Sequence, residues 1–206
     1  SVNQATPQGG WTATFVVLAS PAGSHTIDAS GSSTSVSSVP DITFTTSAGI
    51  SASRTSAAPG SSITITGSGF SAGETGITVT YDDKTVGPGI SADSTGGWKV
   101  TFVIPASPSG SHIIDASSPT TTATTITNIT FTVTPGIAAS RTSAPPGSSI
   151  TITGSGFGAG ETGISITYDG TATTSGITAD ANGGWKASLL VPASPSGSHT
   201  IGVTGS

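Results

Sequence analysis

The sequence has no cysteine, no methionine and very little charge: only 7% of its 206 residues are Asp, Glu, Lys or Arg. Without cysteine the chain has no disulfide, no thiolate zinc site and no thiol nucleophile. Five Lys and Arg residues cannot line a groove that replaces phosphate counterions, which excludes nucleic-acid binding and disfavours anionic membrane surfaces. The longest apolar run, Phe15 to Ala19, is far shorter than the roughly 18 residues of a membrane span. It predicts a strand, and we expect no membrane insertion.

Small polar residues are abundant instead. The chain contains 36 Ser and 37 Thr beside 29 Gly and 13 Pro. Disorder normally accompanies low hydrophobicity and high net charge, whereas this chain carries a net charge of −5 and alternates its apolar residues, so we expect it to fold. The missing initiator Met and signal peptide fit an exported, processed chain or an excerpt of a longer one. With the scarcity of Lys, Glu and Cys, this favours an extracellular location on a prokaryotic cell surface.

An internal repeat of 87 residues organises the chain. Trp11, Trp98 and Trp185 are spaced by this interval, and 46 of 72 positions are identical between residues 48–119 and 135–206. A unit of this size suits one β-sandwich, for which about 100 residues is typical. We predict the C-terminal half of a repeat at 1–47, a complete repeat at 48–134, and a repeat lacking its last strand at 135–206.

Each partial unit would expose half of a hydrophobic core. Two explanations remain open at this point. The chain is a window on a longer array, or neighbouring copies complete the broken sandwiches by lending strands.

Alternation of apolar and polar residues with period 2 fills the complete repeat. The clearest segment runs from Trp98 to Ile104, with Trp98 on one face and Lys99 on the other. No segment combines helical periodicity with length. About seven short strands predict an all-β protein made of tandem immunoglobulin-like β-sandwiches with almost no helix. The expected strands of this repeat are 50–52, 62–66, 77–81, 90–92, 98–104, 112–116 and 129–133.

The segment from Pro59 to Phe70 places Pro-Gly before a strand of alternating Ile and Thr and ends in Gly-x-Gly-Phe; it recurs from Pro146 to Phe157. Together with Ala72-Gly73-Glu74, Gly97-Trp98 and Gly110-Ser111-His112, it resembles the IPT/TIG-type immunoglobulin-like repeats of bacterial and archaeal surface proteins. The resemblance covers the whole repeat and implies the sandwich fold. Such modules serve as stalks, adhesins and enzyme spacers, so it implies no single role.

Histidine is the first candidate for catalysis, and it recurs at one repeat position as His25, His112 and His199. Asp28 and Asp115 follow the first two by three residues, and Gly202 stands at that position in the last repeat. Residues i and i+3 of a strand point to opposite faces, so a His–Asp relay cannot form in this way. We predict that each His caps the edge of its sandwich and bonds a loop carbonyl.

Two acidic loops, Asp93-Ser94-Thr95-Gly96 and Asp180-Ala181-Asn182-Gly183, resemble the start of a calcium site. Calcium takes roughly six to eight oxygens, several of them from carboxylates, whereas each loop holds one Asp and the first repeat has Thr6 there. Glu74 and Glu161 lie in Gly-rich turns far along the chain from these loops. We predict turns stabilised by the Asp side chains, with an inter-repeat calcium as the alternative.

The aromatic residues admit two interpretations. Trp11, Trp98 and Trp185 share one position on an alternating inner face, and Tyr81 and Tyr168 follow inward-facing Ile and Val residues. This pattern favours core packing over a platform that stacks sugars.

The sequence contains candidates for two kinds of covalent modification. Lys99 and Lys186 suggest the isopeptide cross-links of some adhesins, but both point outward and Thr12 replaces them in the first repeat, so we expect no cross-link. The triplet Asn128-Ile129-Thr130 fits an N-glycosylation sequon but falls within an expected strand. The Ser/Thr-rich connection 117–125 is the better candidate for O-linked glycans, with a plain flexible loop as the alternative.

These observations predict a structural protein rather than an enzyme, with no catalytic residue, no cofactor and no metal site. We expect the chain to self-assemble into a stalk, surface layer or filament, with copies of itself as partners and strands completed by neighbouring copies. The alternative is an adhesin or carbohydrate-binding accessory module. For that alternative the relevant surface is the stretch where the repeats diverge most, Asp83–Pro88 against Gly170–Ser175.

Overall fold

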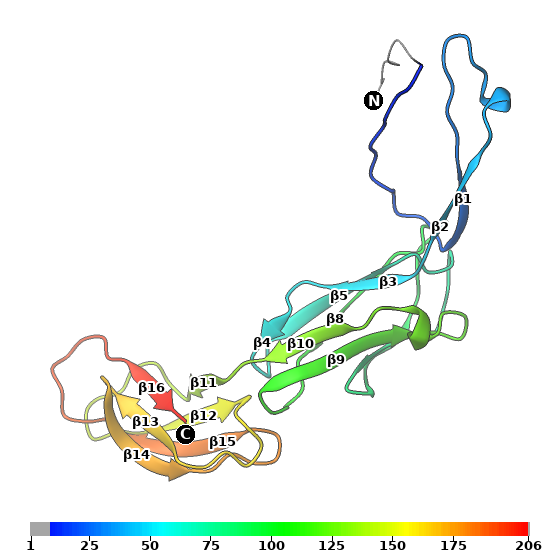
Figure 1. Cartoon of the computed structure of the whole chain (residues 1–206). Coiled ribbons are helices and arrows are strands. Elements are labelled where there is room, and N and C mark those ends of the chain that lie inside the picture. Colours follow the sequence, from blue (N-terminus) through cyan, green and yellow to red (C-terminus); the bar gives the residue numbers. More distant parts are fainter. Residues whose placement is uncertain (1–8, 206) are drawn as a thin grey trace.

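The computed structural model describes residues 9–205, so Thr6 lies outside the described residues. Apart from two short 3-10 turns, η1 (Val36–Ser38) and η2 (Ala123–Thr125), every regular element in this range is a strand. The predicted all-β fold with almost no helix is confirmed. Among these residues no helix has the length and apolar character needed to cross a membrane. Figure 1 shows an elongated chain in which a hairpin, a central sandwich and a C-terminal sandwich follow one another.

The central repeat is a β-sandwich whose strands are β3 (Gly49–Ala52), β4 (Ser56–Ala57), β5 (Ser62–Ser68), β6 (Ile77–Tyr81), β7 (Lys84–Ile90), β8 (Trp98–Val103), β9 (Gly110–Ser117) and β10 (Ile129–Val133). One sheet has the order β3-β5-β8 and the other the order β4-β10-β9-β6-β7. β10 runs parallel to β4, while the other pairs are antiparallel.

Two details of this sandwich differ from the expectation. The stretch 83–88, expected to be a surface loop before a short strand at 90–92, lies mostly in β7, which pairs with β6 across the two-residue turn Asp82-Asp83. Pro88 and two glycines hide the strand signal, and β7 tolerates the proline because it lies at the edge of its sheet. The two-residue β4 was also not predicted.

The alternation along β8 holds as predicted. Trp98 and Phe102 are 5% and 8% exposed, whereas Val103 on the outer face is 56% exposed. The Trp98 ring lies against Gly67 of β5, where any Cβ would collide with the indole, and meets Phe70 edge-on with 5.3 Å between ring centroids. A glycine on the neighbouring strand thus makes room for the largest core residue.

The C-terminal repeat reproduces most of this arrangement with β11 (Gly136–Ala139), β12 (Ser149–Ser155), β13 (Ile164–Tyr168), β14 (Thr171–Ile177), β15 (Trp185–Leu190) and β16 (Ile201–Thr204). Its sheets have the orders β11-β12-β15 and β14-β13-β16. β16 has 4 residues where β9 has 8, and residues 143–144, the counterparts of β4, form no strand. Both differences have one cause: among the described residues, the sheets of this repeat contain no counterpart of β10. In the central repeat β10 is the strand that pairs with β9 and with β4.

The N-terminal part contains one two-stranded sheet, β1 (Gly23–Ile27) paired with β2 (Ile42–Thr46). The prediction of a strand from Phe15 to Ala19 is wrong, because these residues have no regular structure. Their counterpart β8 is held by β5, and the described chain offers this segment no equivalent partner.

Successive repeats are joined by very short connections. Only Thr134 and Pro135 separate β10 from β11, and the Ser109 N–H donates to the Phe157 carbonyl across the junction at 3.0 Å. The strand that closes the central sandwich therefore leads almost directly into the next one (Figure 1).

Candidate functional site

Two of the sequence-based candidates, His112 and Tyr81, lie together at one corner of the central sandwich. Asp82 occupies the turn between β6 and β7 with a positive φ of 47°. Its Oδ2 lies 2.6 Å from His112 Nδ1, and its Oδ1 accepts the Ile113 N–H at 2.9 Å. His112 Nε2 faces the Pro108 carbonyl at 2.9 Å, and the imidazole stacks on the Tyr81 ring with 5.1 Å between centroids.

This geometry leaves His112 without a free ring nitrogen. Both nitrogens face acceptors, a carboxylate and a carbonyl, so the ring donates to both when it carries two protons. Each His was predicted to bond a loop carbonyl, and all three do, through Pro21, Pro108 and Pro195. The arrangement connects the turn between β6 and β7 to the beginning of β9.

The carboxylate partner of the histidine was not predicted. Asp82 precedes His112 by 30 residues. The Asp115 carboxylate instead accepts the N–H of its neighbour Ala116. The available signal was the Tyr-Asp pair at 81–82, which recurs 87 residues later at 168–169.

The last repeat contains the same corner. Asp169 Oδ2 lies 2.7 Å from His199 Nδ1, and the ring stacks on Tyr168 with 4.9 Å between centroids. The bond to Asp169 and then the Pro195 carbonyl raise the pKa of His199 above its ordinary value. The Thr200 N–H and then His199 lower the pKa of Asp169.

The first repeat lacks this acidic partner in the described residues. His25 Nε2 lies 3.1 Å from the Pro21 carbonyl and 3.0 Å from Thr46 Oγ1.

The acidic loops are turns, as predicted. Asp93 Oδ1 accepts the N–H groups of Thr95 and Gly97 at 2.7 and 3.0 Å and the Thr95 hydroxyl at 2.7 Å. These bonds lower the pKa of Asp93, the Thr95 hydroxyl contributing most. Asp180 makes the equivalent turn through Asn182 and Gly184. Within residues 9–205, no three His, Asp or Glu side chains converge as a metal site would require.

Glu74 forms a cluster that the sequence did not reveal. It is 7% exposed, and its carboxylate accepts the Ser71 N–H at 2.7 Å, together with the hydroxyls of Ser118, Thr120 and Thr121. Burial alone would raise the pKa of Glu74, but these hydrogen bonds outweigh it and lower the pKa to about 2. The carboxylate thereby holds the loop between β9 and β10 against the turn between β5 and β6.

Glu161 occupies the same place in the last repeat. It keeps the equivalent of the Ser71 bond, from the Gly158 N–H at 2.8 Å. Gly205 stands where the central repeat has Ser118, so that hydroxyl donor is missing.

The prediction that the tryptophans pack in the core is confirmed for two of the three. Trp98 and Trp185 are 5% and 6% exposed, whereas Trp11 is 55% exposed, so its prediction as a core residue is wrong. Lys99 and Lys186 are exposed on outer faces, as expected. Asn128 is exposed immediately before β10 rather than inside the strand.

The fold and these clusters define a class of protein: tandem β-sandwiches whose corners are held by hydrogen bonds. The chain belongs to the IPT/TIG domain family, whose model matches residues 45–133 and 137–206. Tandem domains of this kind are structural or binding modules and are generally non-catalytic.

Solved structures add only weak likenesses. The fibronectin(III)-like modules of Clostridium thermocellum CbhA match at 14% identity and a TM-score of 0.26, over 76% of this chain and 84% of that one. Murine CEACAM1b matches at 12% identity and a TM-score of 0.27, over 71% of this chain and 85% of that one. The sequence matches no curated protein.

Proposed function

We propose that this chain is a non-catalytic structural segment of an extracellular, cell-surface protein. Its tandem sandwiches assemble with copies of the same chain into a stalk, surface layer or filament, and neighbouring copies complete the open sandwiches. The observation that carries the proposal is the exposed apolar face of the N-terminal part.

Two phenylalanines of this part have counterparts that are buried in the complete central repeat. Phe15 is 61% exposed and Phe44 is 39% exposed, while their counterparts Phe102 and Phe131 are 8% and 0% exposed. Burying a Phe side chain contributes roughly 1.5–3 kcal/mol. Exposed large apolar side chains whose counterparts are buried in the closed repeat support a contact site for another protein surface here.

The junctions and the surface chemistry support a stalk. Two-residue connections and the bond between Ser109 and Phe157 restrict the motion of one sandwich against the next. Ser and Thr are the commonest residues that face solvent, and charged residues are few. We also propose O-linked glycans on this surface; within 117–125, however, three hydroxyls are donors to Glu74, so sugars there would compete with the cluster.

The absence of catalysis is supported by how the titratable groups are used. The ring nitrogens of His112 and His199 bind acceptors on both sides, and Asp93 is committed to a turn. Each group has a structural partner where an enzyme would need it to face a substrate.

Sedimentation velocity of the purified chain over a range of concentrations, with negative-stain microscopy, tests the assembly. We expect concentration-dependent growth that weakens in Phe15→Ser. Val103→Ser is the matched control, because Val103 has a similar exposure of 56% but lies on the outer face of a closed sandwich. A compact monomer at every concentration would contradict the proposal.

One observation favours a second candidate, an adhesin or carbohydrate-binding module. The repeats are near-identical in β5 and β12 but diverge in 83–88 against 170–175, where β7 and β14 form sheet edges. Exchanging these segments between repeats and measuring glycan-array binding tests this role; unchanged or absent binding would rule it out.

A further inference from the structure

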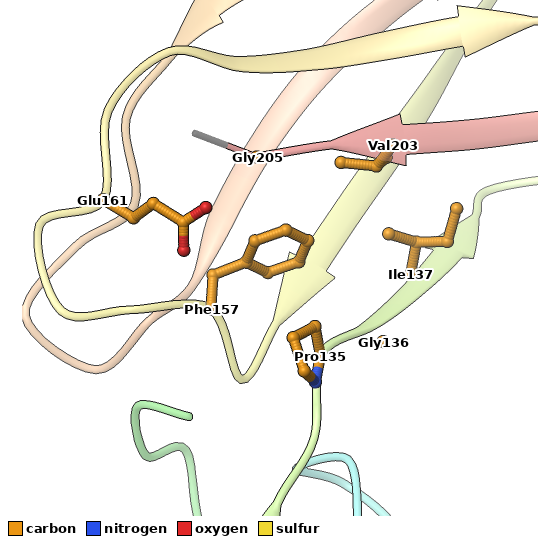
Figure 2. Close-up of a pocket in the computed structure, with 7 residues that line it drawn as sticks. All are labelled: Pro135, Gly136, Ile137, Phe157, Glu161, Val203 and Gly205. Carbon is orange, nitrogen blue, oxygen red and sulfur yellow. The ribbon is translucent and has the colours of Figure 1, made fainter. Parts of the chain in front are cut away.

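A cavity of about 380 Å³ opens in the last repeat, at the end beside its connection to the central repeat (Figure 2). Figure 2 shows Phe157, Val203 and Ile137 lining it, with the Glu161 carboxylate at its rim. Ile137 is 42% exposed there. The cavity thus combines an apolar floor with one acidic acceptor.

The central repeat shows what fills this space when a sandwich is closed. The counterparts of the lining residues, Ile50 and Phe70 among them, pack with Ile126 and Phe131, which are 5% and 0% exposed. Those two side chains come from β10 and the turn before it. The hydroxyls that precede them in the chain bind Glu74.

A matching segment exists elsewhere in the same chain. Residues 31–46 are the counterparts of 118–133 by the 87-residue repeat. Phe44 stands for Phe131, and in the hairpin it is 39% exposed, while the neighbouring Ile42 is 63% exposed. The chain therefore contains both this cavity and, at residues 31–46, a counterpart of the segment that fills the equivalent space in the central repeat. The large apolar side chains Ile42 and Phe44 of that counterpart are exposed.

We propose that residues 31–46 of a second copy occupy this cavity and add β2 to the edge of β16. The inference rests on the proposed assembly and names its contact. Following the register of β10 with β9, Ile42 pairs with Ile201, Phe44 with His199, and Thr46 with Gly197. This pairing is β-strand addition at an open sheet edge.

The hydrogen-bond donors match as well. The counterparts of Thr120 and Thr121 are Ser33 and Thr34, whose hydroxyls reach Glu161 in the filled cavity. A carboxylate in an apolar cavity needs such donors, because burying a charge without hydrogen bonds is costly. The segment thus satisfies both the apolar floor and the acidic rim.

The exchange replaces a weak pairing with a stronger one. β2 leaves β1, with which it forms an isolated two-stranded sheet, a kind of structure that is marginally stable in water. It then continues into β3 of its own chain through Ser47 and Ala48, as β10 continues into β11 through two residues. Copies joined in this way repeat one junction head to tail and form an open fibre.

The test uses a fluorescent peptide of residues 31–47 and anisotropy with the 206-residue chain. We expect saturable binding, and a loss of tenfold or more for the peptide carrying Phe44→Asp, since a buried Phe contributes roughly 1.5–3 kcal/mol and 1.4 kcal/mol is tenfold in affinity. Glu161→Gln in the chain should weaken binding severalfold. Asp83→Asn is the control and should leave binding unchanged, because it removes the same charge from an exposed turn of the central repeat.

The outcomes separate this contact from the proposed assembly. If the peptide does not bind, or if the Phe44→Asp peptide binds equally well, the contact is wrong even when the chain assembles. If the chain stays monomeric in sedimentation but binds the peptide, with the variants weakening binding as expected, the cavity is assigned correctly and the proposal of self-assembly is wrong. Binding that responds equally to Asp83→Asn and Glu161→Gln would also overturn the site.

Discussion

Replacing Glu74 by Gln tests what holds a complete repeat closed. The substitution keeps the size of the side chain and removes its charge, at a position that is 7% exposed. In the folded chain the carboxylate accepts one N–H and three hydroxyls, and all three hydroxyls come from the loop 118–121. The amide of Gln would turn a hydrogen-bearing group toward some of these donors. The loop should then lose its attachment to the turn between β5 and β6.

The pKa of Glu74 sets the magnitude. The interval between its ordinary pKa of 4.5 and the folded-state pKa of about 2 corresponds to roughly 3 kcal/mol of stability at neutral pH. Because the pKa is lowered on folding, this contribution is complete above the ordinary value and is lost as the pH falls toward about 2. We expect Glu74→Gln to cost about 2–3 kcal/mol at pH 7 and progressively less below pH 4.

Urea unfolding followed by tryptophan fluorescence measures the loss, and hydrogen exchange with mass spectrometry assigns it to the central repeat. The control is Glu161→Gln, at the same repeat position, which we expect to cost about 1 kcal/mol or less. Equal losses for the two variants would refute the role of the loop hydroxyls. So would a Glu74→Gln variant whose stability still falls with the wild-type slope between pH 4 and 2.

Three further predictions use one repeat as a control for the other or compare two sites in one repeat. Asp83 has a positive φ of 63° where the last repeat has Gly170, so Asp83→Gly should raise stability by up to about 1 kcal/mol and Gly170→Asp should lower it, as measured by urea unfolding. Gly67→Ala should cost about 3 kcal/mol or more in the same assay, because its Cβ collides with an indole ring, whereas Gly49→Ala, with open space around it, should be nearly neutral. His199 has a raised pKa, so its stabilisation is present at acidic pH and is lost as the pH rises through the folded-state value; His199→Gln should therefore destabilise the last repeat at pH 5 but little at pH 8.

The features that could be predicted from the sequence are those fixed by neighbours in the chain. The alternation in 62–66 and 98–104 predicted β5 and β8 because side chains on a strand point to opposite faces in turn. The bond from His112 to Pro108 spans four residues, and it too was expected. Local geometry decides such features whatever the rest of the fold does.

Contacts between distant segments could not be predicted in the same way. Glu74 and its hydroxyl donors are 44 to 47 residues apart, and Asp82 and His112 are 30 apart. No spacing rule connects them, because the sheet order brings them together. The stretch 83–88 was predicted to be a loop but lies mostly in β7 for a related reason. Its pairing with β6 outweighs the Pro and Gly residues that locally disfavour a strand.

The segment Phe15 to Ala19 shows that the same residue pattern gives different structures in different surroundings. Its counterpart β8 is a buried strand because β5 pairs with it along its length, and without such a partner the pattern yields no strand. A complete sandwich therefore forms only when strands from both halves of the repeat are present. In the central repeat the last segment, from Ser118 to Val133, leads within two residues into the next sandwich. Removing the closing strand of one repeat should thus weaken the junction to the next, so that stability along an array is shared between nearest neighbours.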